Sequence, residues 1–117
     1  MKWTVCALML IVCVLVCHRA VHGFRCYSCQ GGPLTNCAEA SAIGVYEDCA
    51  GRNAQCYEAL VAYQRGALTL VQRRCWQPPK GSNDTNFCDS FDNPVGELGK
   101  CITCTTDLCN TDKKFWL

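Results

Sequence analysis

The sequence has few of the residues on which most catalytic and nucleic-acid-binding sites depend. Its 117 residues include two histidines, His18 and His22, and both lie close to the N-terminus. Eleven basic and ten acidic residues nearly cancel, and no block of like charges exceeds a pair such as Arg73-Arg74. We expect such pairs to be solvated surface, and nothing resembles the basic footprint of a nucleic-acid-binding protein. The chain also has no internal repeat and no heptad, so nothing indicates a solenoid or a coiled coil.

The first 23 residues have the pattern of a secretory signal peptide. Lys2 gives a positive start, residues 5–17 form an uninterrupted apolar run, and small residues lead up to Gly23. The apolar run has 13 residues, whereas a membrane-spanning helix needs roughly 20. We therefore expect residues 1–23 to be a signal peptide cut after Gly23, with a cut after Ala20 as the second choice.

Cleavage at that point changes the composition of the chain. The mature chain keeps 94 of the 117 residues, has a net charge of −1, and retains no histidine and no methionine. It loses three of the thirteen cysteines and keeps an even number, ten. The ten are Cys26, Cys29, Cys37, Cys49, Cys56, Cys75, Cys88, Cys101, Cys104 and Cys109. An even number of cysteines in an oxidising compartment predicts five disulfides, although spacing alone does not choose the pairing.

The clearest local element is a β-hairpin. Residues 57–63 are β-compatible, residues 64–67 contain a glycine and form a turn, and residues 68–74 alternate between apolar and polar. We expect arms of about seven residues. A polar loop with two prolines follows at 77–84, where a central strand is excluded. The best helical candidate is residues 38–43, and we expect no more than one turn there.

Both ends of the cysteine-containing region resemble those of a known family. The start, Phe24-Arg-Cys-Tyr-Ser-Cys29, is an apolar residue followed by C-Y-x-C, and the end, Cys104-Thr-Thr-Asp-Leu-Cys109-Asn110, is C-x4-C-N. These motifs resemble those of the lymphocyte antigen-6 / urokinase receptor superfamily, the three-finger or LU domain that snake toxins share. The resemblance covers residues 24–110 and leaves 111–117 as a short tail. It implies a small disulfide-rich all-β fold, a three-finger antiparallel sheet with five disulfides.

The resemblance also implies the roles of particular residues. Asn110 would hydrogen-bond back into the region where the fingers meet. Finger I would fall within residues 30–48, finger II at 57–74 and finger III at 89–100, with its tip at 92–96. The implied disulfides are Cys26–Cys56, Cys29–Cys37, Cys49–Cys75, Cys88–Cys101 and Cys104–Cys109.

Three features depart from the usual vertebrate pattern of this family. Ile102 and Thr103 separate two cysteines that are normally adjacent, which resembles the arthropod members. The segment between Trp76 and Phe87 is long and adds a loop before finger III. After Cys109 only eight residues follow, whereas a glycolipid-anchor signal needs a spacer of about 8–12 residues and a tail of about 10–20. This C-terminus therefore does not support a glycolipid anchor, and we expect a soluble, secreted, extracellular protein.

Catalytic and metal sites are not expected in the mature chain. No histidine remains for a Ser-His-Asp or Cys-His arrangement, and the carboxylates at 47–48, 89 and 92 are interpreted as solvated surface. The pairs that begin at Cys26 and Cys101 mimic half of a zinc site each, but 71 residues lie between Cys29 and Cys101, against a usual ~15–20. We expect no enzyme activity, no cofactor and no small-molecule substrate.

Two surface features are candidates for modification and for binding. Asn83-Asp84-Thr85 is an N-x-T sequon in a polar loop of a secreted chain, so we expect Asn83 to be glycosylated. Tyr63, Gln64 and Arg65 would project at the tip of finger II, and aromatic and arginine side chains on rigid supports are favoured at protein interfaces. The alternative is that Arg65 only solvates a turn.

The family resemblance implies a secreted three-finger binding protein that modulates a membrane receptor or ion channel through its finger loops. The expected partner is the extracellular domain of a membrane protein, and contact with the membrane itself would be indirect. One alternative is a cell-surface, junction-organising or trafficking factor, if a glycolipid-anchored isoform exists. Another is a toxin-like effector, since finger-tip residues vary on a common scaffold and the fold does not fix the function.

Overall fold

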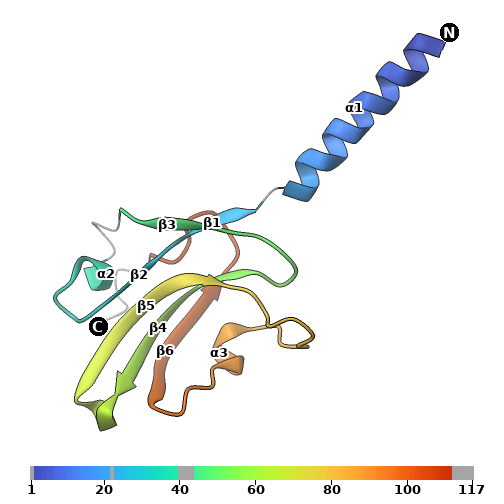
Figure 1. Ribbon diagram of the computed structural model, residues 1–117. Helices are drawn as coiled ribbons and strands as arrows, with labels where there is room; N and C mark the ends of the chain where they lie inside the picture. Colours follow the sequence, from blue (N-terminus) through green and yellow to red (C-terminus); the bar gives the residue numbers. More distant parts are fainter. Residues whose placement is uncertain (1, 22, 40–43, 112–117) are drawn as a thin grey trace.

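The computed structural model describes residues 2–21, 23–39 and 44–111. Helix α1 (Lys2–Val21) projects away from a β-rich domain that begins at Phe24 (Figure 1). The side chains described in α1, among them Trp3 and Met9, are exposed. Among the described residues, none of the helices combines the length and the apolar character that crossing a bilayer requires.

Within these described residues, the domain is built from two antiparallel sheets, whereas the family resemblance implies one. The smaller sheet pairs two strands, and the larger has the strand order β2-β5-β4-β6 (Figure 1). The two strands of the smaller sheet are β1 (Phe24–Tyr27) and β3 (Tyr46–Cys49). The larger sheet consists of β2 (Cys29–Gly31), β4 (Gln55–Tyr63), β5 (Leu68–Trp76) and β6 (Gly96–Cys104). Finger I is divided between the sheets because β1 turns away after Tyr27, and β2 then adds to the edge of β5.

The hairpin of β4 and β5 is the central element, as the sequence predicts. Its register runs from Gln55 opposite Trp76 to Tyr63 opposite Leu68. Each arm has nine residues, longer than expected, because the strand pairing continues past Cys56 and Cys75, which lie opposite each other in the register. Strand β6 pairs along the other side of β4 and forms one arm of finger III.

Among the described segments, three short helical turns connect the strands. They are α2 (Asn36–Glu39), the 3-10 turn η1 (Gln64–Gly66) and α3 (Phe87–Ser90). The helix expected at 38–43 begins two residues earlier, and residues 40–43 lie outside the described part of the chain. Helix α3 was not expected. It begins where Asn86 Oδ1 accepts a hydrogen bond from Cys88 N at 2.8 Å, which is an N-cap.

In the part of the chain that the structure describes, the buried side chains form three small clusters. The first lies between the two sheets and consists mainly of cysteines around Cys26, Cys49 and Cys56. The second packs α2 onto Val71 of β5, and the third packs Phe87 of α3 onto Tyr57 and Val61 of β4. No cluster is large, so cross-links carry much of the stability of this architecture.

The burial of Arg73 shows that the interpretation of the Arg73-Arg74 pair as solvated surface is wrong for Arg73. Arg74 is exposed, but Arg73 is fully buried and points to the opposite face of β5. Consecutive residues of a strand alternate between faces, so only one member of the pair can reach water here. The sequence contains no local signal for this, because the ion-pair partner of Arg73 is Glu58, on the neighbouring strand.

Candidate binding surface at the finger tips

Five disulfides hold the bases of the fingers together. The structure joins Cys26–Cys56, Cys29–Cys37, Cys49–Cys75, Cys88–Cys101 and Cys104–Cys109, the pairs that the family resemblance implies. The sulfur atoms of Cys26, Cys49 and Cys75 lie within 4.8 Å of one another. The sulfur atoms of Cys56, Cys104 and Cys109 form a second group with the same spacing. Each of these sulfurs belongs to a disulfide and is not a thiolate, which is the form that binds metal ions.

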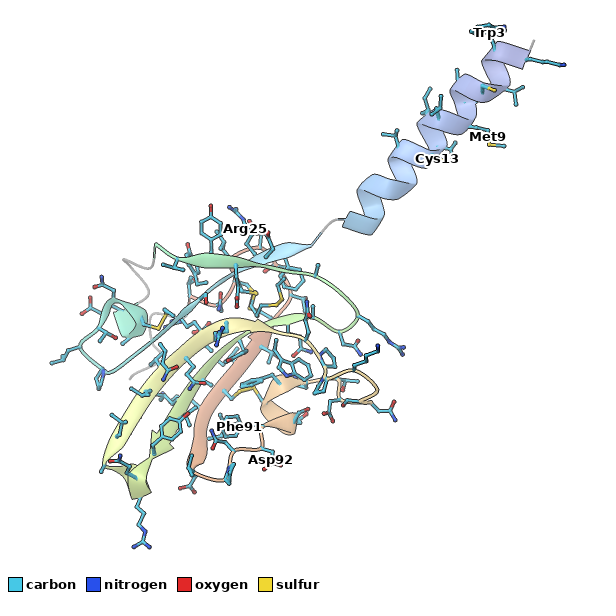
Figure 2. All side chains as sticks on the ribbon, in the orientation of Figure 1. Trp3, Met9, Cys13, Arg25, Phe91 and Asp92 are labelled. Carbon is cyan, nitrogen blue, oxygen red and sulfur yellow. A yellow bond between two sulfur atoms is a disulfide. The ribbon has the colours of Figure 1, made fainter. Side chains whose placement is uncertain are left out.

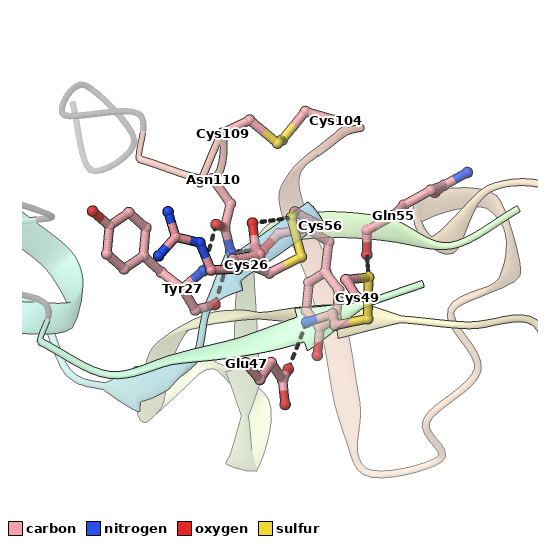
Figure 3. Close-up of a disulfide and its surroundings, with 12 residues drawn as sticks. Cys26, Tyr27, Glu47, Cys49, Gln55, Cys56, Cys104, Cys109 and Asn110 are labelled. Carbon is pink, nitrogen blue, oxygen red and sulfur yellow. Dashed lines mark hydrogen bonds between the residues drawn. A yellow bond between two sulfur atoms is a disulfide. The ribbon is translucent and has the colours of Figure 1, made fainter. Parts of the chain in front are cut away.

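Asn110 fastens the end of the domain to both sheets. Its Oδ1 accepts a hydrogen bond from Tyr27 N at 2.9 Å, and its Nδ2 donates to Tyr27 O at 2.9 Å (Figure 3). The same Nδ2 donates to Tyr57 O at 3.2 Å. The residue is fully buried. One amide therefore satisfies three backbone groups on strands β1 and β4, which is the role that the family resemblance implies for it.

An exposed ion pair reinforces the same junction. Arg25 donates from Nε and Nη2 to the two carboxylate oxygens of Asp107, and its backbone N–H donates to Oδ1 at 2.9 Å. These hydrogen bonds from Arg25 lower the pKa of Asp107 to about 2. The Arg25 guanidinium also lies 5.0 Å from the centre of the Tyr46 ring. In Figure 2, Arg25 lies at the end of the domain opposite the turn that joins β4 and β5.

A shallow groove of about 630 Å³ lies at that turn. It crosses one face of the larger sheet near the finger tips. Its lining consists of Gln30, Tyr63, Gln64, Arg65, Leu68, Leu70 and Val95. The structure thus brings the three predicted tip residues together with apolar side chains, those of Leu68, Leu70 and Val95, that were not predicted to lie there. Leu68 is 43% exposed and Val95 is 72% exposed, so the groove offers apolar surface beside the Arg65 guanidinium.

The backbone at the tip has an unusual conformation. Gln64, Arg65 and Gly66 have φ values of 52°, 58° and 90°, all in the left-handed region. The N–H of Ala67 donates to Gln64 O at 3.2 Å, which closes a turn of the mirror-image type with Arg65 and Gly66 at its centre. Glycine suits this turn, but an arginine there costs roughly 1–2 kcal/mol. Gly66 was the sequence signal for the turn, and nothing in the sequence indicated the strain at Arg65.

Tyr63 is held at the edge of the groove. Its hydroxyl accepts a hydrogen bond from Gln72 Nε2 at 3.1 Å. A Cβ atom at Gly96 would lie 2.9 Å from the Tyr63 ring, so the ring packs where a larger residue would displace it. The position of this aromatic side chain is therefore set by both neighbouring strands.

The acidic residues Glu47, Asp89 and Asp92 and the sequon at Asn83 do not line the groove. Glu47 is not simply solvated, because its Oε1 accepts a hydrogen bond from Cys75 N at 2.7 Å. Asp89 lies in the first turn of α3, and Asp92 is exposed on the loop before β6. The sequon residues Asn83 and Thr85 are both exposed, on the loop between β5 and α3.

Three disulfide-based fingers joined by a buried asparagine define a class of small extracellular modules that bind other proteins. A family model described as the Quiver family u-PAR/Ly-6-like domain matches residues 24–110. The chain therefore belongs to the Quiver family of Ly-6/u-PAR-like domains. Neither the curated proteins nor the solved structures contain a significant match. Domains of this kind are generally binding modules without catalytic activity.

Proposed function

We propose that this protein modulates a membrane receptor or ion channel by binding its extracellular domain with the tip of finger II. The observation that carries the proposal is the groove at that tip, where Arg65 and Tyr63 flank the exposed apolar side chain of Leu68. Aromatic and arginine side chains at the centre of an apolar patch are the groups that contribute most to protein interfaces.

The strain at Arg65 supports the same proposal. A left-handed arginine lowers the stability of the turn, and asparagine or glycine would fit this position better. Strained residues cluster at functional sites, where the surrounding structure holds them in place. Here β4 and β5 are paired up to Tyr63 and Leu68, so the turn presents the guanidinium from a stiff support.

The test uses the purified, oxidised protein to capture surface proteins from cells by crosslinking. Arg65→Asn removes the guanidinium while suiting the left-handed turn, so a loss of capture cannot be attributed to unfolding. We expect capture to fall at least about tenfold, the effect of one interface side chain worth ~1.4 kcal/mol. Lys80→Ala is the matched control, because Lys80 is an exposed basic residue on the loop that follows β5.

Equal capture by the wild type and Arg65→Asn would remove the finger II tip from the proposal. A fall of the same size with Lys80→Ala would show that the effect depends on net charge alone. The captured proteins themselves decide the class of partner, and a receptor or channel subunit is the expected outcome.

The route to the cell exterior forms part of the proposal. Domains of this family are extracellular or secreted. We take residues 1–23 to be a signal peptide. Its cleavage would also remove Cys6 and Cys13, which are exposed and form no disulfide. Sequencing of the exported protein should then begin at Phe24.

A further inference from the structure

The loop between β5 and α3 has no regular structure but is fixed at both ends. Trp76 and Phe87 contact each other edge to face, with ring centroids 6.2 Å apart. Gln55 accepts from Phe87 N at 3.3 Å and donates from Nε2 to Thr85 O. The loop therefore leaves the sheet and returns to it at almost the same point.

Inside this loop, the sequon lies next to a tight turn. The N–H of Ser82 donates to Pro79 O at 2.9 Å, and Gly81 has the left-handed φ of 83° that such a turn requires. Ser82 Oγ then accepts from Asp84 N at 3.0 Å. Asn83 is exposed between these two contacts, and within the described chain its side chain has no hydrogen-bond partner.

A polar pocket of about 370 Å³ lies beside Asn83. It separates the loop from the turn at Arg52 and Asn53, which precedes β4. Its lining includes Arg52, Asn53, Pro78, Pro79, Ser82 and Asn83. Two proline rings give it apolar walls, and a guanidinium, an amide and a hydroxyl supply hydrogen-bonding groups. That combination suits a sugar ring, which has an apolar face and a rim of hydroxyls.

We propose that Asn83 carries an N-linked glycan and that its first N-acetylglucosamine unit packs into this pocket. In the transfer, Asn83 Nδ2 bonds to the anomeric carbon of a lipid-pyrophosphate-linked oligosaccharide. The bond from that carbon to the phosphate oxygen breaks, the lipid pyrophosphate leaves with the electron pair, and the amide nitrogen loses one proton. The attached sugar then bridges the 78–85 loop and the Arg52–Asn53 turn.

The position of the glycan is compatible with binding at the finger tips. The loop follows Trp76, at the end of β5 away from the β4–β5 turn (Figure 1). The nine residues of β5 separate its two ends by about 26 Å. A glycan on Asn83 would cover the base of the domain and leave the groove at Arg65 open.

The first experiment measures occupancy in protein exported from a eukaryotic host with high-mannose glycans. Thr85→Ala destroys the sequon, and Thr85→Ser is its matched control because it keeps a hydroxyl at the required position. Peptide mapping should find sugar on Asn83 in the wild type and in Thr85→Ser, and none in Thr85→Ala. An unmodified Asn83 in the exported wild type overturns the proposal.

The second experiment tests the pocket by hydrogen exchange at residues 53–54 and 80–82. Exchange in the glycosylated wild type should be about tenfold slower than in Thr85→Ala. Trimming with endoglycosidase H, which leaves one sugar, should preserve this protection. Arg52→Ala should remove much of it in glycosylated protein and have no effect in the Thr85→Ala background.

Equal exchange with and without the glycan, or the same effect of Arg52→Ala in both backgrounds, contradicts the packing of the sugar. These readouts do not involve a partner protein. They can therefore fail while the proposed function holds, and the reverse is also possible.

Discussion

Arg73 and Glu58 form an ion pair that is closed off from solvent in the middle of the β4–β5 hairpin. Arg73 is fully buried and Glu58 is 2% exposed. The same guanidinium donates to Cys37 O at 2.7 Å, to Ala38 O at 3.4 Å and to Asn110 O at 3.0 Å. One side chain thus connects finger II to finger I and to the end of the domain.

Removing one partner of this pair should destabilise the domain strongly. Glu58→Ala leaves the buried guanidinium without its counter-charge, which should lower the free energy of unfolding by about 3–5 kcal/mol. Denaturant unfolding with the disulfides intact measures the change. Glu97→Ala is the control, because Glu97 is an exposed acidic residue on β6 and should change stability by less than about 0.5 kcal/mol. Similar effects of the two substitutions would contradict the importance of the buried pair.

Asn110 should be almost as sensitive, for a different reason. Asn110→Ala leaves three backbone groups of Tyr27 and Tyr57 without the partner that the amide provides. We expect a loss of about 2–4 kcal/mol, since the buried Tyr57 carbonyl costs ~1–3 kcal/mol when it loses its partner and the part-buried Tyr27 groups cost less. Asn93→Ala is the comparison, because the Asn93 side chain accepts one exposed hydrogen bond, from Val95 N. A loss below about 1 kcal/mol for Asn110→Ala would mean that the two sheets stay joined without it.

The contact between Arg25 and Asp107 predicts a dependence of stability on acid pH. The pKa of Asp107 is about 2, below its ordinary value of 3.8, because Arg25 hydrogen-bonds to the ionised carboxylate. The folded protein therefore binds the proton of the Asp107 carboxyl group less tightly than the unfolded chain does. The contribution of the Arg25–Asp107 contact to the free energy of unfolding is fully present above about pH 4. It is lost as the pH falls through 2.

Unfolding midpoints between pH 5 and pH 1.5, compared between the wild type and Asp107→Asn, measure that contribution. The wild type should lose more stability than the variant on acidification. Because both side chains are exposed, the difference should be small and should shrink further at high salt. Parallel curves for the two proteins would contradict the assigned pKa.

The strained turn predicts a substitution that stabilises the protein. Arg65→Asn places an asparagine before Gly66 in a turn that favours this pair, so the free energy of unfolding should rise by about 0.5–1 kcal/mol. Gly66→Ala should have the opposite effect, because alanine is strained at a φ of 90°. A destabilised Arg65→Asn variant would show that the arginine stabilises the turn by contacts that outweigh its strain.

Local sequence was sufficient to predict the hairpin of β4 and β5, because alternation and a glycine turn lie within twenty residues. The disulfide pairing did not follow from spacing and came from the resemblance of the two end motifs. The buried state of Arg73 could not be predicted, since it depends on strand register and on partners such as Cys37 and Asn110, more than thirty residues away. Three residues of the tip, Tyr63, Gln64 and Arg65, were predicted as a binding candidate, but the groove was not, because Val95 reaches it from another finger.

The edge-to-face contact of Trp76 and Phe87 has a consequence for how this domain can change. Since the two rings close the neck of the 77–86 loop, and Gln55 and Asn86 hold its return to α3, we expect residues inserted at the exposed turn of Lys80 and Gly81 to leave β5 and α3 in place. This turn is therefore a natural point for an affinity tag, a fluorophore or an inserted peptide. The same freedom would let relatives diversify this segment while their disulfide framework stays constant.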